Sequence, residues 1–251
     1  MSTTTTDGPV ALVTGAGAGI GLATGRRLLA AGHRIVANDV DPAALDATWG
    51  DEPSDRVVHA VADVSDADAV TAAVDAAVGR LGRLDAVVNN AALHGAAWVG
   101  PCLDSTPEQW RRLLDVNVVG VVNVVRACAD HLAASGGVVV NVSSMVAYGI
   151  GSGSGYAVTK AAVNGLTTSL ASELGPRGIR VVGVAPGFIS TPYLLSGMSE
   201  ERQRALVDQQ AMDVHGGPED IAAVIEFLVS PSARLVTGHT LIADAGALRR
   251  P

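Results

Sequence analysis

The segment Val10-Ala-Leu-Val-Thr14-Gly15-Ala-Gly-Ala-Gly19-Ile20-Gly21 decides the fold. A β-branched run passes directly into a glycine-rich turn, after which the pattern becomes helical. In such a strand–turn–helix unit, glycines let backbone N–H groups approach a pyrophosphate closely, and the helix N-terminus favours its negative charge. Gly15, Gly19 and Gly21 fit the spacing G-x-x-x-G-x-G, and no Lys-Ser or Lys-Thr pair follows, unlike a nucleotide-hydrolysing P-loop. The segment predicts a dinucleotide site, the alternative being an ordinary tight turn.

Short apolar runs alternate with helical stretches along the rest of the chain. Apolar strands that alternate with helices favour a parallel sheet joined by right-handed crossovers. We therefore expect an α/β, three-layer, doubly wound fold with a parallel sheet of about seven strands. The expected strands are residues 10–14, 34–37, 57–62, 86–89, 138–142, 179–184 and 240–243.

The domain organisation follows from the absence of a repeat period or an internal linker in the sequence. We expect one domain over residues 1–251, with residues 1–8 as a flexible tail and 187–217 as a helical flap over the site. Thr106-Pro107-Glu108-Gln109 has the pattern of a capping box with proline at the first helical position. One long helix should follow to about residue 133, and Gly136-Gly137 should end it.

Composition narrows the classes of function. The 251 residues are 48% hydrophobic and 17% charged, so a large core can form without disulfides. A net charge of -8 argues against non-specific binding to nucleic acid or to an anionic membrane. No signal peptide or long apolar run is found, which predicts a cytoplasmic protein. Neither the two cysteines nor the six histidines have metal-ligand spacing, so no metal is expected.

Two aspartates follow expected strands. Asp39 comes 18 positions after Gly21, where a carboxylate can accept hydrogen bonds from both hydroxyls of an adenosine ribose and would repel a 2′-phosphate. Because Ala18, Asn38 and Val40 offer no cation, the sequence predicts NAD(H) rather than NADP(H). Asp63 could accept from the adenine amino group, or it could equally cap the next helix.

The motif Tyr156-Ala-Val-Thr-Lys160 completes a resemblance to the short-chain dehydrogenase/reductase family over nearly the whole chain, with a Rossmann-type fold. The tracts that carry it, in chain order, are Thr14–Gly21, Asn89-Asn90-Ala91-Ala92, Asn117-Val-Val-Gly, Val139–Ser144, Pro186–Thr191 and Thr237–Gly246. Ala92 stands where the family usually has glycine. The resemblance implies that the cofactor is held by Gly15, Gly19, Ile20, Asp39, Asp63, Val64, Asn90, Tyr156, Lys160, Pro186, Gly187, Ile189 and Thr191.

The resemblance also implies the catalytic residues Asn117, Ser144, Tyr156 and Lys160. Tyr156 and Lys160 are spaced i,i+4, which places both on one helix face. In this reading Lys160 lowers the pKa of Tyr156 and holds the nicotinamide ribose, and Tyr156 exchanges a proton with the substrate. Ser144 donates to the substrate oxygen, and Asn117 helps hold a water that links Lys160 to solvent.

The serine assignment has a competitor. Family spacing counted back from Tyr156 reaches Ser143, whereas the pattern at the strand end points to Ser144. We choose Ser144, because strand registers tolerate fewer changes than loops do.

The predicted function is hydride transfer between NAD(H) and a small-molecule alcohol or ketone. The alternatives are a non-catalytic NAD-sensing protein on the same fold, and a lyase or epimerase that uses transient oxidation. The resemblance further implies a homotetramer. The sequence does not select among secondary alcohols, sugars, steroids, acyl thioesters and cyclic diols.

Overall fold

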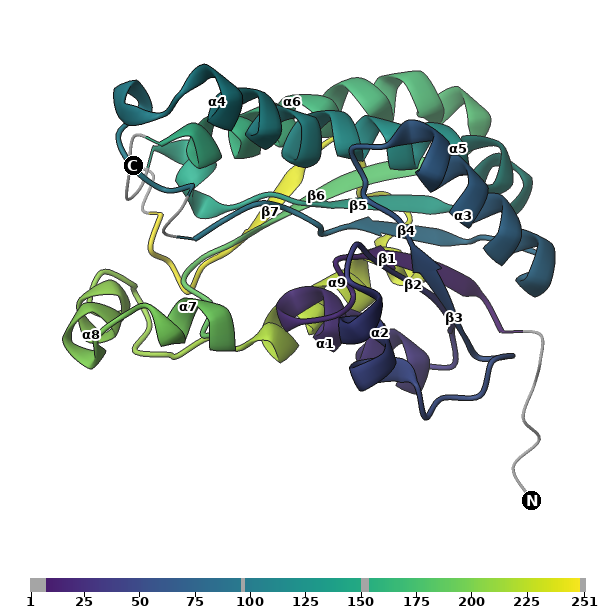
Figure 1. Ribbon diagram of the computed structural model, residues 1–251, viewed down its shortest axis with the longest axis horizontal. Coiled ribbons are helices and arrows are strands. Elements are labelled where there is room, and N and C mark those ends of the chain that lie inside the picture. The colour runs from purple at the N-terminus through teal and green to yellow at the C-terminus, as the bar shows by residue number, and fades with distance from the viewer. Residues whose placement is uncertain (1–7, 96–97, 150–153, 249–251) are drawn as a thin grey trace.

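The computed structural model describes residues 8–95, 98–149 and 154–248. Its centre is, as expected, a parallel sheet of seven strands, and these lie in the order β3-β2-β1-β4-β5-β6-β7 (Figure 1). The strands are β1 (Val10–Thr14), β2 (Arg34–Asp39), β3 (Val57–Val61), β4 (Ala86–Asn89), β5 (Val138–Val142), β6 (Arg180–Pro186) and β7 (Thr240–Ala243). Four strands have the predicted bounds. The second is two residues longer than predicted, the third one residue shorter, and the sixth is shifted toward the C-terminus.

Two layers of helices cover the sheet (Figure 1). The helices are α1 (Gly19–Ala30), α2 (Pro42–Trp49), α3 (Ala67–Leu81), α4 (Pro107–Leu114), α5 (Gly120–Ser135), α6 (Gly155–Leu174), α7 (Pro192–Ser196), α8 (Glu200–Val207) and α9 (Pro218–Val229). Helices α3, α5 and α6 pack on one face of the sheet, and α1, α2 and α9 pack on the other. This arrangement is the doubly wound α/β fold.

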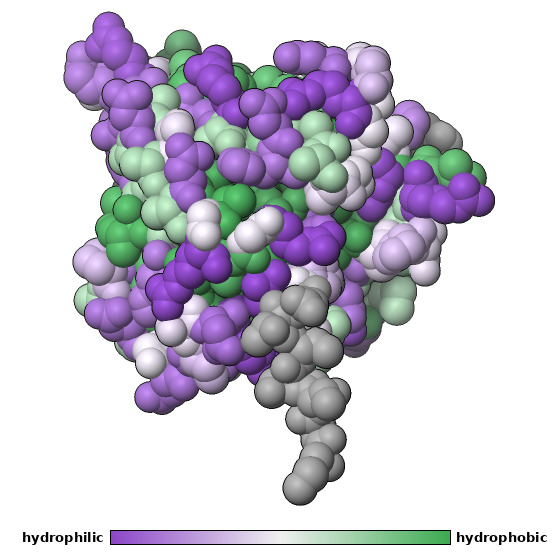
Figure 2. All heavy atoms as spheres, turned by 90° about the vertical axis from the view of Figure 1, so that its right-hand side faces the viewer, coloured by the Kyte–Doolittle hydropathy of each residue, from purple (hydrophilic) through white to green (hydrophobic). Residues whose placement is uncertain are grey.

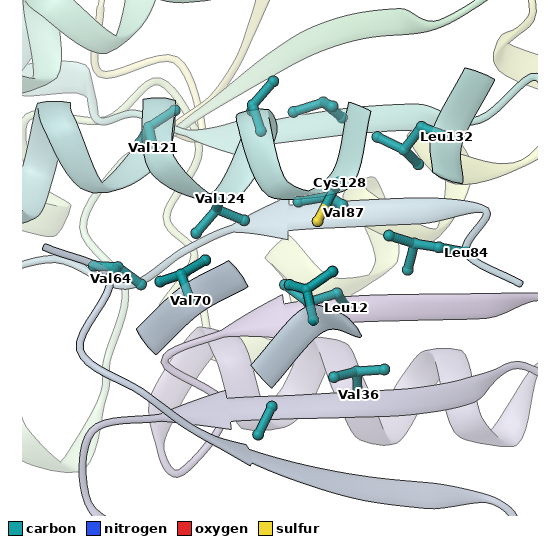
Figure 3. Close-up of a cluster of buried hydrophobic side chains, with 14 of the residues drawn as sticks. Leu12, Val36, Val64, Val70, Leu84, Val87, Val121, Val124, Cys128 and Leu132 are labelled. Atoms are coloured by element: carbon teal, nitrogen blue, oxygen red, sulfur yellow. The ribbon is translucent and has the colours of Figure 1, made fainter. Parts of the chain in front are cut away.

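The alternation of side chains along each strand builds two separate cores. Leu12 of β1 and Val87 of β4 join the cluster under α3, α5 and α6, whereas their neighbours Val13 and Val88 join the cluster under α1, α2 and α9. Figure 3 shows the first cluster, in which Cys128 of α5 points toward the sheet. Because both faces are covered, the strands read as nearly continuous apolar runs.

The carboxyl ends of β1 and β4 lie where doubly wound sheets in general have their ligand crevice. The chain winds outward from β1 to β3 and then returns to the other side of β1 with β4. In open parallel sheets, ligands bind at such a reversal of strand order. Figure 2 shows the opposite end of the molecule, where hydrophilic residues cover most of the surface with smaller hydrophobic areas between them.

The expected long helix after Thr106 contains one irregular turn. The capping box forms as predicted, with Thr106 and Gln109 hydrogen-bonded reciprocally, and Gly136 ends α5 in the left-handed conformation at φ +66°. Between α4 and α5, however, residues Asp115–Val119 form one π-helical turn. The predicted long helical segment therefore forms, continuous over residues 107–135, but it is not uniform, and its π turn contains Asn117.

The expected flap contains α7 and α8, which lie beyond the carboxyl end of β6 (Figure 1). An isolated parallel bridge joins Ile189 to Gly216, close to the two ends of the segment. After α8, the flap is also tied to the segment that follows β7: the N–H groups of Ala211 and Met212 both donate to the carbonyl of Ala245, at 3.0 and 3.1 Å. Among the described residues, no helix is both long and apolar enough to span a bilayer. Residues 1–7 of the expected tail lie outside the described residues, whereas the Gly8 carbonyl accepts from the Arg34 side chain.

Trp49 at the end of α2 generates a stability prediction. Its side chain is 1% exposed, and its indole N–H donates to the carbonyl of Ala16 at 3.0 Å. We expect Trp49→Ala to lower the free energy of unfolding by about 3–5 kcal/mol, because it opens a cavity and leaves a carbonyl of the glycine loop unpaired. Urea unfolding measures this loss. Leu103→Ala is the control, because Leu103 is 98% exposed and its loss should be nearly neutral; equal losses for both variants would contradict the prediction.

Candidate active site

The glycine loop turns the chain between β1 and α1, and several of its glycines stand where a side chain would not fit. Gly15 and Gly19 have φ of +66° and +54°, and a Cβ at Gly21 would lie 2.0 Å from the carbonyl oxygen of Gly15. Helix α1 starts after Ala18 with no side-chain cap and no acidic residue in its first turn. Its N-terminal N–H groups are therefore available to an external anion. The loop fits the pyrophosphate of a dinucleotide by this test, and Ile20 lies in the first turn of the same helix.

Asp39, the last residue of β2, lies beside this loop. Its carboxylate accepts hydrogen bonds from the backbone N–H of Gly17 at 3.0 Å and from that of Asp41 at 3.1 Å. A Cβ on Gly17 would lie 2.9 Å from both the carboxylate and the side chain of Ala44. The structure thus places a half-buried negative charge next to the glycine loop, where the sequence predicted it.

Asp63 does not cap the next helix, so that alternative was wrong. Asp66 is the N-cap of α3 and accepts from the N–H groups of Asp68 and Ala69. Asp63 instead lies two residues beyond β3 and forms an ion pair with Arg112 of α4 at 2.7 Å. Val64 beside it is 6% exposed and packs in the core under α5 (Figure 3).

Asn90 joins the end of β4 to the glycine loop. Its side-chain amide donates to the carbonyl of Thr14 at 2.9 Å and to that of Gly15 at 3.3 Å. In the other direction, the Thr14 hydroxyl accepts from the backbone N–H groups of Asn90 and Ala91. These bonds hold the two strand ends together at the crevice. The role of the Thr14 side chain was not predictable, because a threonine at a strand end has many other uses.

The loop after β6 borders the glycine loop. Thr191 caps α7, and its methyl group would lie 3.5 Å from a Cβ on Gly19. Ile189 is 8% exposed, and Gly187 packs so tightly on the backbone of Asp244 that a Cβ there would lie 2.6 Å from its Cα. Together with Pro186 at the end of β6, these residues bring the start of the flap to the same crevice.

The two candidate serines differ in their surroundings. Ser143 is 2% exposed, and its hydroxyl donates to the backbone carbonyl of Lys160 at 3.1 Å. Ser144 is half-buried, and its side chain forms a hydrogen bond with Tyr156. Ser144 therefore lies beside the phenol, whereas Ser143 supports the helix that carries it. The catalytic assignment stays a prediction, and this geometry favours Ser144.

Lys160 and Tyr156 lie on one face of α6, as their spacing predicts. The Nζ atom of Lys160 is 5.6 Å from the centre of the Tyr156 ring and donates to the carbonyl of Val142 at 2.7 Å. The lysine is only 3% exposed. Burial disfavours its charged form and lowers the pKa of Lys160 to about 8.

The expectation that Lys160 lowers the pKa of Tyr156 is not met in this structure. Burial raises the pKa of Tyr156 to about 12, and the hydrogen bond with Ser144 opposes that rise only in part. The physical reason is desolvation, because removing the phenol from water disfavours the tyrosinate.

Asn117 is 1% exposed, and its side chain connects two elements instead of facing open space. Its amide oxygen accepts from the backbone N–H of Leu93 at 2.7 Å, and its nitrogen donates to the carbonyl of Leu93 and to the hydroxyl of Thr159. Asn117 thereby ties the segment after β4 to α6, one residue before Lys160. A role in holding a water stays a prediction.

His94 follows Leu93 and lies within the electrostatic reach of the site. Partial burial, and secondly the positive charge of Lys160, lower the pKa of His94. From its place in the sequence, His94 was expected near the mouth of the site, with a surface role favoured over a contact with the substrate. Its position follows from the grip of Asn117 on Leu93, which sequence spacing does not reveal. Within residues 8–95, 98–149 and 154–248, no group of three or more His, Cys, Asp or Glu side chains could hold a metal ion.

The comparisons with known proteins agree with this geometry. Residues 15–247 match the family described as enoyl-(acyl carrier protein) reductase. The chain is 36% identical to cis-4-hydroxycyclohexanecarboxylate dehydrogenase of Sinomonas cyclohexanicum, over 94% of this chain and 95% of the relative. It is 37% identical to galactitol 2-dehydrogenase of Cereibacter sphaeroides, over 96% and 95% of the two chains.

The crystal structure of 3-ketoacyl-(acyl-carrier-protein) reductase from Brucella melitensis, complexed with NADH, superposes with a TM-score of 0.88. Sequence identity to it is 33%, and the match covers 96% of this chain and 98% of that one. With the sheet order, the glycine loop and the Tyr156–Lys160 pair, these matches show that the chain belongs to the short-chain dehydrogenase/reductase family of oxidoreductases.

Proposed function

We propose that this oxidoreductase uses NAD(H) and transfers a hydride between the nicotinamide and the carbon of an alcohol or ketone. One observation carries the proposal: the Tyr156 phenol touches the Ser144 side chain and lies over the buried ammonium of Lys160. These groups come from the end of β5 and the start of α6. The carboxyl end of β5 lies at the same edge of the sheet as the glycine loop.

The chemistry divides between the bound dinucleotide and the chain. The nicotinamide supplies or accepts the hydride when it is bound. Ser144 donates a hydrogen bond to the substrate oxygen and positions it. Tyr156 takes the hydroxyl proton in oxidation and returns one in reduction. Because both hydroxyls are already paired with each other, one oxygen atom of the substrate can contact both.

Lys160 has a specific task in this proposal. Its Nζ atom donates to the backbone carbonyl of Val142. Hydroxyl groups of a cofactor ribose would add further acceptors and would raise the pKa of Lys160 from about 8 toward its ordinary value. A lysine that keeps its charge favours the tyrosinate. Binding the cofactor would thus prepare Tyr156 for proton transfer.

The choice of NAD(H) rests on Asp39. Its carboxylate is held against the glycine loop by the N–H of Gly17, which orients it toward the adenosine end of a dinucleotide on that loop. A 2′-phosphate at this position would meet a like charge. The related reductase from Brucella melitensis was crystallised with NADH, which is consistent with the proposal.

The proposed cofactor contacts follow the glycine loop, the strand ends and the flap. The residues are Gly15, Gly19, Ile20, Asp39, Asp63, Val64, Asn90, Tyr156, Lys160, Pro186, Gly187, Ile189 and Thr191. Asn117 completes the catalytic set by fixing Leu93 and Thr159 beside Lys160. We further infer one domain, with residues 187–217 as the flap over the substrate.

The substrate is proposed to be a small-molecule alcohol or ketone. The relatives include dehydrogenases named for galactitol, meso-2,3-butanediol and cis-4-hydroxycyclohexanecarboxylate, all of which bear hydroxyl groups. We also propose a cytoplasmic homotetramer. Leu114, Val119 and Val158, on α4, the π turn and α6, are 38%, 44% and 47% exposed and offer apolar surface for assembly.

Tyr156→Phe tests the enzymatic role. The variant keeps the ring but loses the exchangeable proton, so turnover should fall by at least about a hundredfold while NADH binding changes little. Absorbance of reduced nicotinamide measures turnover against a panel of alcohols with NAD⁺ and ketones with NADH.

Ser144→Ala should lose turnover strongly at unchanged cofactor affinity. Ser143→Ala is its neighbouring comparison and should retain more activity. A protein that binds NADH but turns over no substrate in the panel would favour an NAD-sensing role.

Asp39→Ala tests the cofactor preference. Loss of the carboxylate should weaken NADH binding by about tenfold and improve NADPH binding, because a hydrogen-bond acceptor for ribose and a like charge disappear together. Fluorescence titration with both dinucleotides measures the ratio of dissociation constants. Asp41→Ala is the control on the same turn. An unchanged ratio in Asp39→Ala would refute the NAD(H) assignment.

Lys160→Met tests the cost of the buried ammonium. Since the folded pKa of about 8 lies below the ordinary 10.5, the folded state binds the proton less tightly than the unfolded chain. Burying the charged lysine therefore lowers the free energy of unfolding by about 3 kcal/mol below pH 8, and this loss fades as the pH rises toward 10.5. The stability of wild type relative to Lys160→Met should therefore improve by more than half of this amount between pH 7 and pH 9.5 in urea unfolding. A difference that does not vary with pH would contradict the burial of a charged lysine.

A further inference from the structure

The loop that follows β3 is held by one long helical segment, α4 through α5. Arg112 of α4 forms an ion pair with Asp63, at 2.7 Å between Nη2 and Oδ2, and its other terminal nitrogen donates to the hydroxyl of Ser65 at 2.8 Å. Farther along, the side-chain amide of Asn123 donates to the carbonyl of Val64 at 3.0 Å. A Cβ on Gly120 would lie 2.7 Å from a methyl of Val64, so the backbone of α5 packs directly on this loop.

The Asp63 carboxylate is oriented by these contacts. The N–H and the hydroxyl of Ser65 donate to Oδ1 at 2.9 and 2.7 Å, and Arg112 donates to Oδ2. Burial alone would raise the pKa of Asp63, but the hydrogen bonds from Arg112 and Ser65 outweigh it and the pKa is lowered. Asp63 is therefore a fixed, ionised acceptor, and Oδ2 keeps lone-pair capacity beyond its bond to Arg112.

Arg112 stands apart from its neighbour on the same helix. Arg111 pairs with Glu108, one turn earlier on α4, and both side chains are at least 70% exposed. Arg112 instead reaches across to a segment 47–49 positions away in the sequence. A guanidinium that bonds two side chains of one loop limits the orientations available to the carboxylate.

We propose that Arg112 is a positioning residue for the adenine end of the cofactor site. This inference rests on the proposed use of NAD(H). Arg112 bonds to Asp63 and to Ser65 at the same time. It thereby fixes the orientation of the Asp63 carboxylate, which accepts a hydrogen bond from the adenine 6-amino group. Arg112 acts through Asp63 and does not itself contact the dinucleotide. The side chain thus contributes to recognition of the base, and the phosphates and the nicotinamide do not depend on it.

The test compares NADH with reduced nicotinamide hypoxanthine dinucleotide, in which an oxo group replaces the adenine 6-amino group. Fluorescence titration or calorimetry gives both dissociation constants without requiring a known substrate. The wild type should prefer NADH. In Arg112→Ala, NADH binding should weaken roughly three- to tenfold while binding of the hypoxanthine analogue changes little, because a partly exposed charge-assisted contact is lost. The preference between the two dinucleotides should shrink accordingly.

Matched variants separate positioning from stability. Arg111→Ala should leave both constants unchanged. Arg112→Lys, which keeps the charge without the planar fork, should recover part of the preference and covers the case in which Arg112→Ala folds poorly. In an Asp63→Ala background, Arg112→Ala should add no further loss of NADH affinity.

The outcomes distinguish this inference from the proposed function. Equal weakening of both dinucleotides, or NADH binding within twofold of wild type, in Arg112→Ala would overturn the role of Arg112 while leaving NAD(H) use intact. Wild-type protein that binds neither dinucleotide would overturn the proposed function itself.

Discussion

The ammonium of Lys160 is the most demanding feature of this molecule. A buried charge without partners is strongly unfavourable, and this one donates to the backbone carbonyl of Val142. The surrounding fold supplies the stability that makes such a placement tolerable. Strand β5 presents the carbonyl, α6 presents the amine, and Ser143 ties the backbone of α6 back to the strand end. The doubly wound sheet is the scaffold that keeps these parts in register.

The strand pattern was predictable because each strand is buried on both faces and reads as a short apolar run. Strand ends were less predictable where polar residues continue the ladder: Asn38 and Asp39 extend β2 because their backbone pairs with Ala60 and Val61 of β3. The glycine loop, Asp39 and the Tyr156–Lys160 pair come from local spacing, and the structure brings them to one edge of the sheet. Local spacing reports on side chains within one element, so these groups could be found without knowing the tertiary structure.

Contacts between distant elements were not predictable in this way. The hydrogen bonds of Asn117 to Leu93 and the pairing of Arg112 with Asp63 both join segments more than twenty residues apart. The raised pKa of Tyr156 was not predictable for a related reason. The i,i+4 spacing shows that two side chains are neighbours, but the cost of removing both from water depends on what the rest of the chain packs around them. Burial is a property of the whole fold.

The π turn at Asp115–Val119 determines how the side chains of α4 are rotated about the helix axis relative to those of α5. Upstream of it Arg112 faces the loop after β3, within it Asn117 faces the segment after β4, and downstream Asn123 faces the loop after β3 again. A π turn accommodates one residue more than a regular α-helical turn does. Removing that residue would rotate everything on one side by about 100° relative to the other. The helix would then be regular throughout, but its side chains could no longer contact both the loop after β3 and the segment after β4.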